Sequence, residues 1–254
     1  MRSFMSDKKT NWQDSAQKNS LNTFMSTFSR LIRMTLKNVK TELAVALKSS
    51  ETFGSARRKV ISQKDDIITQ CSESIVSAVS STNPDNAGNK GDLLKEANEK
   101  AENAGKMLKK LQSSMGNDYG RWWKRDLHVL LVQAEQEVVE AFSTLAVIKQ
   151  EEIPPRDILF RSQDPDSYLK TKKYVRVSDE AYVYGLLDCI GELKRVALNS
   201  DKSDHDLALH IFEIMRELFR ELEPFSKYSN SFKILKLKID VNRNLITDTE
   251  KSLK

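Results

Sequence analysis

The chain has 254 residues, of which 39% are hydrophobic and 30% are charged, so it can bury a substantial core and still present a charged surface. No run of residues approaches the ~18 uncharged apolar residues of a membrane span, and no apolar segment followed by a small-residue cleavage site marks a secretory signal. These absences argue against a membrane-spanning or secreted protein, and we expect no membrane partner.

The net charge of +5 is unevenly distributed along the chain. Residues 1–64 carry thirteen Lys and Arg against four Asp and Glu, a balance of +9, which leaves −4 for the rest. A basic arm on an acidic body suits contact with nucleic-acid phosphates, although a solvated helical face explains the charges equally well.

Cys71 and Cys189 lack metal-ligand spacing, which is typical of reduced core cysteines in a cytoplasmic or nuclear protein.

Proline and glycine divide the chain into helical segments. Residues 1–21 are polar and basic, and we expect them to form a disordered arm before one helical domain at 22–254. A basic amphipathic stretch, Met25–Leu36, also fits a transit peptide, but the continuing helical pattern favours ordinary structure. Apolar residues recur at helical spacing in seven segments: 22–50, 56–81, 90–116, 121–149, 178–199, 205–223 and 227–252. Because the best strand candidate, Tyr174–Val177, is too short for a sheet, we predict an all-α bundle.

The helix predicted at 121–149 is apolar over most of its circumference and should lie at the centre of the bundle or at a subunit interface. It nevertheless carries Glu137 and Glu140, which lie about 60° apart around the axis and face one neighbour. Like charges repel in a poorly solvated environment, so these carboxylates need compensation, and a divalent cation is the simplest candidate.

A second acidic pair lies on the helix predicted at 178–199. Asp188 and Glu192 are about 40° apart around the axis, on a stripe of small residues opposite the main apolar face. Gly185 and Gly191 each cost about 1 kcal/mol of helix propensity against alanine, which suggests that a backbone or a substrate approaches there.

If the two helices face each other, four carboxylates converge, and oxygen ligands without histidine favour Mg²⁺ or Mn²⁺ over zinc. Such a site can hold metal ions that bind a phosphodiester and generate a hydroxide. The spacing alone leaves open separate salt-bridge networks with Arg195 or Lys194, because both acidic spacings are common on helices.

Three local sequences carry a family resemblance: the basic-aromatic run at 121–125, Glu-Val-Val-Glu-Ala-Phe at 137–142, and Gly-Leu-Leu-Asp-Cys-Ile-Gly-Glu-Leu at 185–193. They resemble the translin family, whose fold has seven α-helices. Weaker similarity runs from about Lys37 to Lys251. The catalytic branch of that family, translin-associated factor X, has an ExxE motif followed by DxxGE, and this chain has both.

The resemblance implies a Mg²⁺-dependent endoribonuclease subunit with catalytic residues Glu137, Glu140, Asp188 and Glu192, the last three as metal ligands. It also implies a hetero-octamer with a translin-like partner, cleaving short single-stranded RNA such as passenger strands of RNA silencing or tRNA fragments. Binding of DNA is a further expectation. The location implied is cytoplasmic, nuclear or both.

Two basic segments are candidate RNA contacts. The aromatic and cationic side chains near residue 122 can stack on bases and bind phosphates, or can pack half-buried in the bundle. The lysines near residue 172 can guide RNA to the second acidic helix, or can simply face solvent. The residues expected to bind RNA are Trp122, Lys124, Arg125, Lys172 and Lys173.

Two other functions remain possible at this stage. One is a non-catalytic translin-like subunit that binds RNA or DNA and in which the four carboxylates are structural. The other is an all-α nucleoside triphosphate pyrophosphohydrolase, which also uses acidic pairs on neighbouring helices. In that class the second motif is usually ExxD at shorter separation, whereas 47 residues lie between Glu140 and Asp188 here.

Overall fold

The computed structural model describes residues 6–118, 127–154, 177–201, 203–228 and 234–254, with side chains described from Lys37 onward except Asn38 and residues 115–118. Within these ranges the chain forms six α-helices, two short 3₁₀-helices and no strand, so the prediction of an all-α fold is confirmed. The helices are α1 (Ser6–Ser80), α2 (Lys90–Asp118), α3 (His128–Ile148), α5 (Asp179–Ser200), α6 (His205–Leu222) and α7 (Leu235–Ser252). The 3₁₀-helices are η1 (Pro84–Asn89) and η3 (Glu223–Tyr228).

Two helix boundaries differ from the prediction. The segments expected at 22–50 and 56–81 belong to one helix, α1, because no proline separates them and Gly54 alone costs only about 1 kcal/mol. The last helix begins at Leu235 rather than near 227, since η3 occupies Glu223–Tyr228. The segment Tyr174–Val177, judged too short for a sheet, lies outside the described residues except for Val177, which is not in a strand.

The chain divides into two compact units, residues 1–55 and 56–254. In the first unit the described side chains include the exposed apolar residues Val39, Leu43 and Leu47, which share one face of the helix. The expected division at residue 21 between an arm and a helical domain stays a prediction.

No helix in the described part of the chain is both long and apolar enough to cross a membrane.

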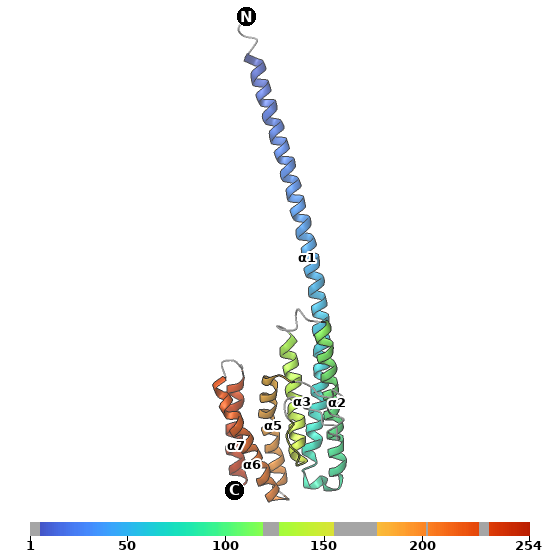
Figure 1. The fold of residues 1–254 in the computed structure, drawn as a ribbon, viewed down its shortest axis with the longest axis vertical. Coiled ribbons are helices and arrows are strands. Elements are labelled where there is room, and N and C mark those ends of the chain that lie inside the picture. The colour runs from blue at the N-terminus through green and yellow to red at the C-terminus, as the bar shows by residue number, and fades with distance from the viewer. Residues whose placement is uncertain (1–5, 119–126, 155–176, 202, 229–233) are drawn as a thin grey trace. The chain divides into compact units, whose positions relative to one another are not determined.

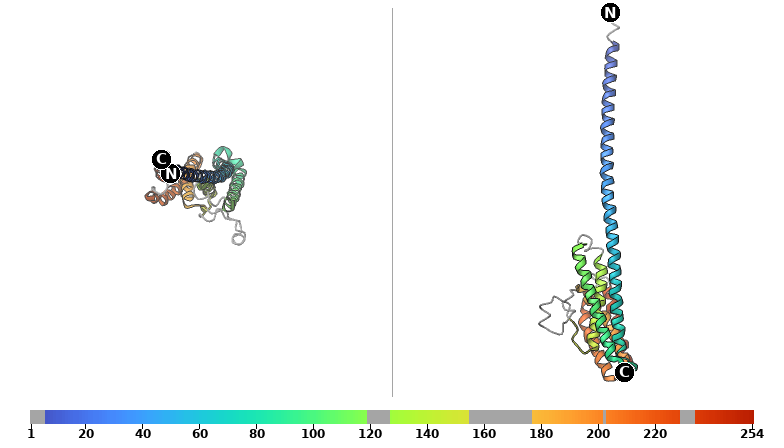
Figure 2. Two further views of the ribbon diagram at one scale, coloured as in Figure 1. Left: turned by 90° about the horizontal axis from the view of Figure 1, so that it is seen from above. Right: turned by 90° about the vertical axis from the view of Figure 1, so that its right-hand side faces the viewer.

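In the second unit the helices lie side by side (Figures 1 and 2). Helix α3 packs against α2 on one side and against α5 on the other, and α5 also packs against α6 and α7. The core between them contains the largest fully buried side chains, which are Ile67, Leu108, Leu111, Leu127, Leu187, Ile190, Leu193, Met215, Leu235 and Ile239. Helices α3 and α5 are therefore central, as the apolar circumference of the first of them predicts.

The start of α5 is fixed by side chains that satisfy its free N–H groups. The Ser178 hydroxyl accepts a hydrogen bond from the Ala181 amide, which is a typical N-cap. The Ser178 amide donates to Oε2 of Glu135 on α3 at 2.9 Å, and Gln112 on α2 donates to the other oxygen of Glu135 at 3.0 Å. One buried carboxylate thus connects α2, α3 and α5 and sets the register of the two acidic helices.

Candidate active site

Glu137 and Glu140 are partly buried on α3, one on each side of the buried residues Val138 and Val139. Burial raises the pKa of Glu140 to about 9, and the charges of Asp188, Glu137 and Glu192 add to this effect. Burial also raises the pKa of Glu137, followed by the charge of Asp188. No ion pair joins either glutamate to a residue in the described ranges, so at neutral pH Glu140 keeps its proton unless a cation arrives.

Asp188 and Glu192 on α5 have protein partners instead. Lys238 on α7 forms an ion pair with Oδ1 of Asp188, and the side-chain amide of Gln136 donates to Oδ2 at 2.6 Å. Arg195 donates to Glu192 at 2.8 Å, which is one of the salt bridges that the alternative interpretation of the spacing left open. This half of the site is neutralised by the chain itself.

The four carboxylates are neighbours in the structure. Gln136, next to Glu137 on α3, donates from its side chain to Asp188 at 2.6 Å, and Thr144, one turn beyond Glu140, donates to the thiol of Cys189 at 3.5 Å. The charges of Asp188 and Glu192 also raise the pKa of Glu140. Helices α3 and α5 therefore bring the two acidic pairs together, as the sequence predicts if the helices face each other. Their catalytic role stays a prediction.

Two buried thiols border this acidic cluster, defined here as Glu137, Glu140, Asp188 and Glu192. The Cys71 thiol on α1 has a pKa raised by burial and then by the charges of Glu137 and Glu140. Burial raises the pKa of the Cys189 thiol to about 12, although a hydrogen bond from Thr144 opposes the shift. Both are free cysteines, and their high pKa values keep them as unreactive thiols at neutral pH.

The two glycines of α5 have different structural roles. A Cβ at Gly185 would lie 2.6 Å from the backbone oxygen of Gln136 and 2.6 Å from Cβ of Val139, so α3 and α5 touch here. A Cβ at Gly191 would meet only Leu245 at 3.9 Å, an ordinary contact. Close helix packing therefore explains Gly185, whereas nothing in the packing requires a glycine at position 191.

The donor chemistry of the cluster suits a hard divalent cation, because every candidate ligand is a carboxylate. Burial, followed by the charges of the neighbouring carboxylates, raises the pKa of Glu140. The geometry is less complete. Within the described ranges, no group of three or more His, Cys, Asp or Glu side chains is arranged to hold a metal ion. Asp188 is oriented toward Lys238 and Gln136, and Glu192 toward Arg195, so ligation requires these side chains to reorient.

Sequence reasoning missed three residues of this site. Lys238 is 50 residues away from Asp188, Gln136 lies beside Glu137, and Lys64 on α1 lowers the pKa of Glu137. No local spacing identifies Lys238 or Lys64, because each reaches the cluster from another helix. Position 136 could have been found, since it lies on the same side of α3 as Glu140.

The residues expected to contact RNA cannot be placed. Trp122, Lys124 and Arg125, and likewise Lys172 and Lys173, lie outside the described residues. Their role in binding stays a prediction.

Comparison with known proteins identifies the family. The Translin family pattern matches residues 55–253, which is most of the chain, so this chain belongs to the Translin family. The match begins at the boundary between the two compact units. No curated protein matches the chain.

Solved structures share the fold. The chain is similar to a subunit of an AfC3PO–duplex RNA complex, with 22% identity and a TM-score of 0.63, over 84% of this chain and 94% of that one. A crystal structure of AfC3PO gives 23% identity and a TM-score of 0.59, over 83% of this chain and 94% of that chain. The helical fold of this chain is therefore similar to that of AfC3PO.

Proposed function

We propose that the chain is a metal-dependent endoribonuclease subunit of the translin-associated factor X type. The observation that supports this most directly is the convergence of Glu137 and Glu140 on α3 with Asp188 and Glu192 on α5. These residues complete the ExxE and DxxGE motifs of the catalytic branch in a member of the Translin family. The fold shared with a protein solved in complex with duplex RNA supports RNA as the substrate class.

The roles of the four carboxylates follow from their surroundings. Glu140, Asp188 and Glu192 would hold Mg²⁺ or Mn²⁺, and the bound metal supplies an activated water for attack on an RNA phosphodiester. Glu137, like Glu140, has no ion-pair partner among the described residues, and its raised pKa suits a group that would accept a proton from water. Cys71, Cys189 and the apolar side chains around them limit access of bulk water on the inner side.

A hetero-oligomer with a translin-like subunit fits the family, as does single-stranded RNA held inside such an assembly. DNA is a second possible ligand. We place the chain in the cytoplasm, the nucleus or both.

The test is cleavage of a short single-stranded RNA by the full chain co-expressed with a translin-like subunit, with and without Mg²⁺. The wild type should cut only with the metal, and a Glu137→Ala/Asp188→Ala double variant should not cut. A matched control replaces two exposed glutamates of α6, Glu213→Ala/Glu221→Ala, and should cut like the wild type.

A non-catalytic RNA-binding subunit is the second candidate function. Its supporting observation is that Lys238 and Arg195 already neutralise the α5 half of the cluster, as in a structural salt-bridge network. RNA binding without cutting by wild type and double variant alike would establish this function and exclude the nuclease. Family membership favours either function over a nucleotide pyrophosphohydrolase.

A further inference from the structure

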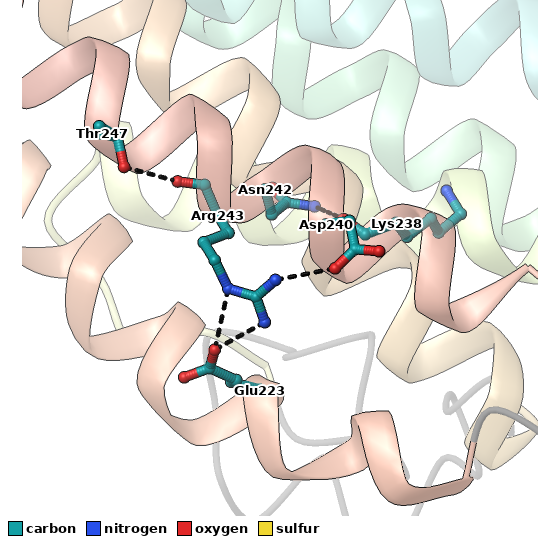
Figure 3. Close-up of polar contacts among 6 residues, drawn as sticks. All are labelled: Glu223, Lys238, Asp240, Asn242, Arg243 and Thr247. Carbon is teal, nitrogen blue, oxygen red and sulfur yellow. Dashed lines mark hydrogen bonds and ion pairs between the residues drawn. The ribbon is translucent and has the colours of Figure 1, made fainter.

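Lys238 enters the acidic cluster from a third helix. Its ammonium pairs with Oδ1 of Asp188 and lies 5.6 Å from the centre of the Tyr184 ring, close enough for a cation–π interaction. Figure 3 shows the Lys238 side chain extending away from the ion pair between Arg243 and Glu223, which lies on another side of α7. Two charged residues of one helix thus serve different purposes.

The position of Lys238 is fixed by its helix. Leu235 and Ile239 are buried on either side of it in sequence, and the Asn242 amide donates to the Lys238 carbonyl at 2.9 Å. The side chain is 17% exposed, and its ammonium is carried on a four-carbon stem with several rotatable bonds. A rigid helix therefore presents a flexible ammonium to the rim of the cluster.

The ammonium acts on Glu137 and Glu140 as well as on Asp188. Its charge lowers the pKa values of both Glu137 and Glu140, although burial and neighbouring carboxylates outweigh it. Lys238 is thus a counter-ion shared by three of the four carboxylates. A divalent cation bound by Asp188 would take the same place, and the two positive charges would repel each other there.

We propose that Lys238 is a built-in counter-ion that competes with the divalent cation for Asp188 until an RNA phosphate draws the ammonium away. This inference rests on the proposed nuclease function and adds a way to regulate the same site. A lysine ammonium binds phosphate oxygens well, and its long stem lets it exchange one anion for another without moving α7. Metal and RNA then bind cooperatively, each assisting the other by the same factor.

The experiment measures Mn²⁺ affinity from the electron paramagnetic resonance signal of free Mn²⁺, using the full chain with its translin-like partner. It is run with and without a non-cleavable 2′-O-methyl RNA. Without RNA, Lys238→Met should bind Mn²⁺ about tenfold more tightly than the wild type. RNA should tighten Mn²⁺ binding about tenfold in the wild type and hardly at all in Lys238→Met. Lys236→Met, an exposed residue of the same helix, is the control and should behave as the wild type.

A second variant guards against misfolding. Lys238→Gln retains a hydrogen-bond donor toward Asp188 without the charge, and should show the same gain in metal affinity. If the wild type binds Mn²⁺ and neither variant binds it more tightly, the competition does not exist, while the proposed nuclease stands. If no form binds Mn²⁺ with or without RNA, the metal-dependent function fails and the inference fails with it.

Discussion

The two halves of the acidic cluster, one on α5 and one on α3, differ in whether the chain supplies ion-pair partners for their carboxylates. On α5, Asp188 and Glu192 have Lys238, Gln136 and Arg195 as partners, whereas Glu137 and Glu140 on α3 are ion-paired to no residue in the described ranges. Burial and repulsion instead raise the pKa values of both glutamates. Among the described residues, only the α5 half of the cluster therefore has ion-pair partners. The metal ion of the proposed function would supply the positive charge that the α3 half lacks.

The largest expected effect is a loss of RNA cleavage when Asp188, in the α5 half of the cluster, is changed. Asp188→Asn keeps the size of the side chain and its hydrogen bond with the Gln136 side chain after an amide flip, but removes the charge that holds Lys238. If Asp188 is a metal ligand, Mg²⁺-dependent cleavage of RNA should fall about 100-fold or more in single-turnover assays. Asp240→Asn on α7 is the control, since Asp240 pairs only with Arg243 among the residues described. Unchanged cleavage by Asp188→Asn would make the partnered half structural.

The contact that brings the two halves together is the next to test. Gly185→Ala places a methyl group against the backbone of Gln136 and the side chain of Val139, so α3 and α5 must separate. We expect the free energy of unfolding to fall by about 3 kcal/mol, measured by urea denaturation of the full chain. A loss below about 1 kcal/mol would mean that the helices can shift without cost, and the cluster would then be looser than described.

The buried carboxylate at the start of α5 holds the two halves in register. Glu135→Ala leaves the Ser178 amide and the Gln112 side chain without their acceptor, and should cost about 2 kcal/mol in the same denaturation assay. Glu221→Ala, on an exposed part of α6, should change stability by less than about 0.5 kcal/mol. Equal losses in both variants would contradict a special role for Glu135.

Glu140, in the α3 half of the cluster, should make the stability of the metal-free chain depend on pH. The pKa of Glu140 is about 9 in the folded chain and near 4.5 when unfolded, so the folded chain holds a proton that the unfolded chain releases. This stabilisation is complete below pH 4.5 and is lost as the pH rises through about 9.

Between about pH 5 and pH 8, the wild type should therefore lose about 2 kcal/mol, allowing for partial exposure of the carboxyl group. Glu140→Gln, which cannot ionise, should lose clearly less over the same range in urea titrations without metal. A wild type whose stability rises with pH would show that Glu140 is already compensated.

The smallest effect separates the two glycines. Gly191→Ala meets only an ordinary contact with Leu245 and removes a poor helix former, so stability should rise by about 0.5–1 kcal/mol. Cleavage activity is the informative companion measurement. A more stable variant that no longer cuts RNA would show that position 191 is kept small for a ligand, and unchanged cleavage would show that it is not.

The sequence predicts much of this molecule because the relevant patterns are local. Helical spacing and the scarcity of proline and glycine indicate an all-α fold, and the ExxE and DxxGE spacings place two carboxylates on one side of each of two helices. The convergence of these helices depends on Gly185, whose small size the sequence shows but whose neighbour it does not.

What the sequence could not predict depends on distant contacts. Lys238 lies on a helix whose register against α5 is set by packing of Leu235 and Ile239, not by any motif near Asp188. Glu135 resembles its acidic neighbours in sequence, yet it is a buried cap acceptor and not a member of the cluster. Residues 22–50 and 56–81 belong to one helix rather than two, because Gly54 alone does not end α1.

The hydrogen bond between the Ser178 amide and Glu135 holds one end of α5 in place. Asp188 lies ten residues further along, at a distance of about 15 Å at the usual rise per residue. A tilt of α5 by about 4° about this hydrogen bond moves Asp188 by about 1 Å, a displacement that can change a catalytic rate by about 100-fold. The proposed activity therefore depends on a contact at the start of α5 that is remote from the four carboxylates.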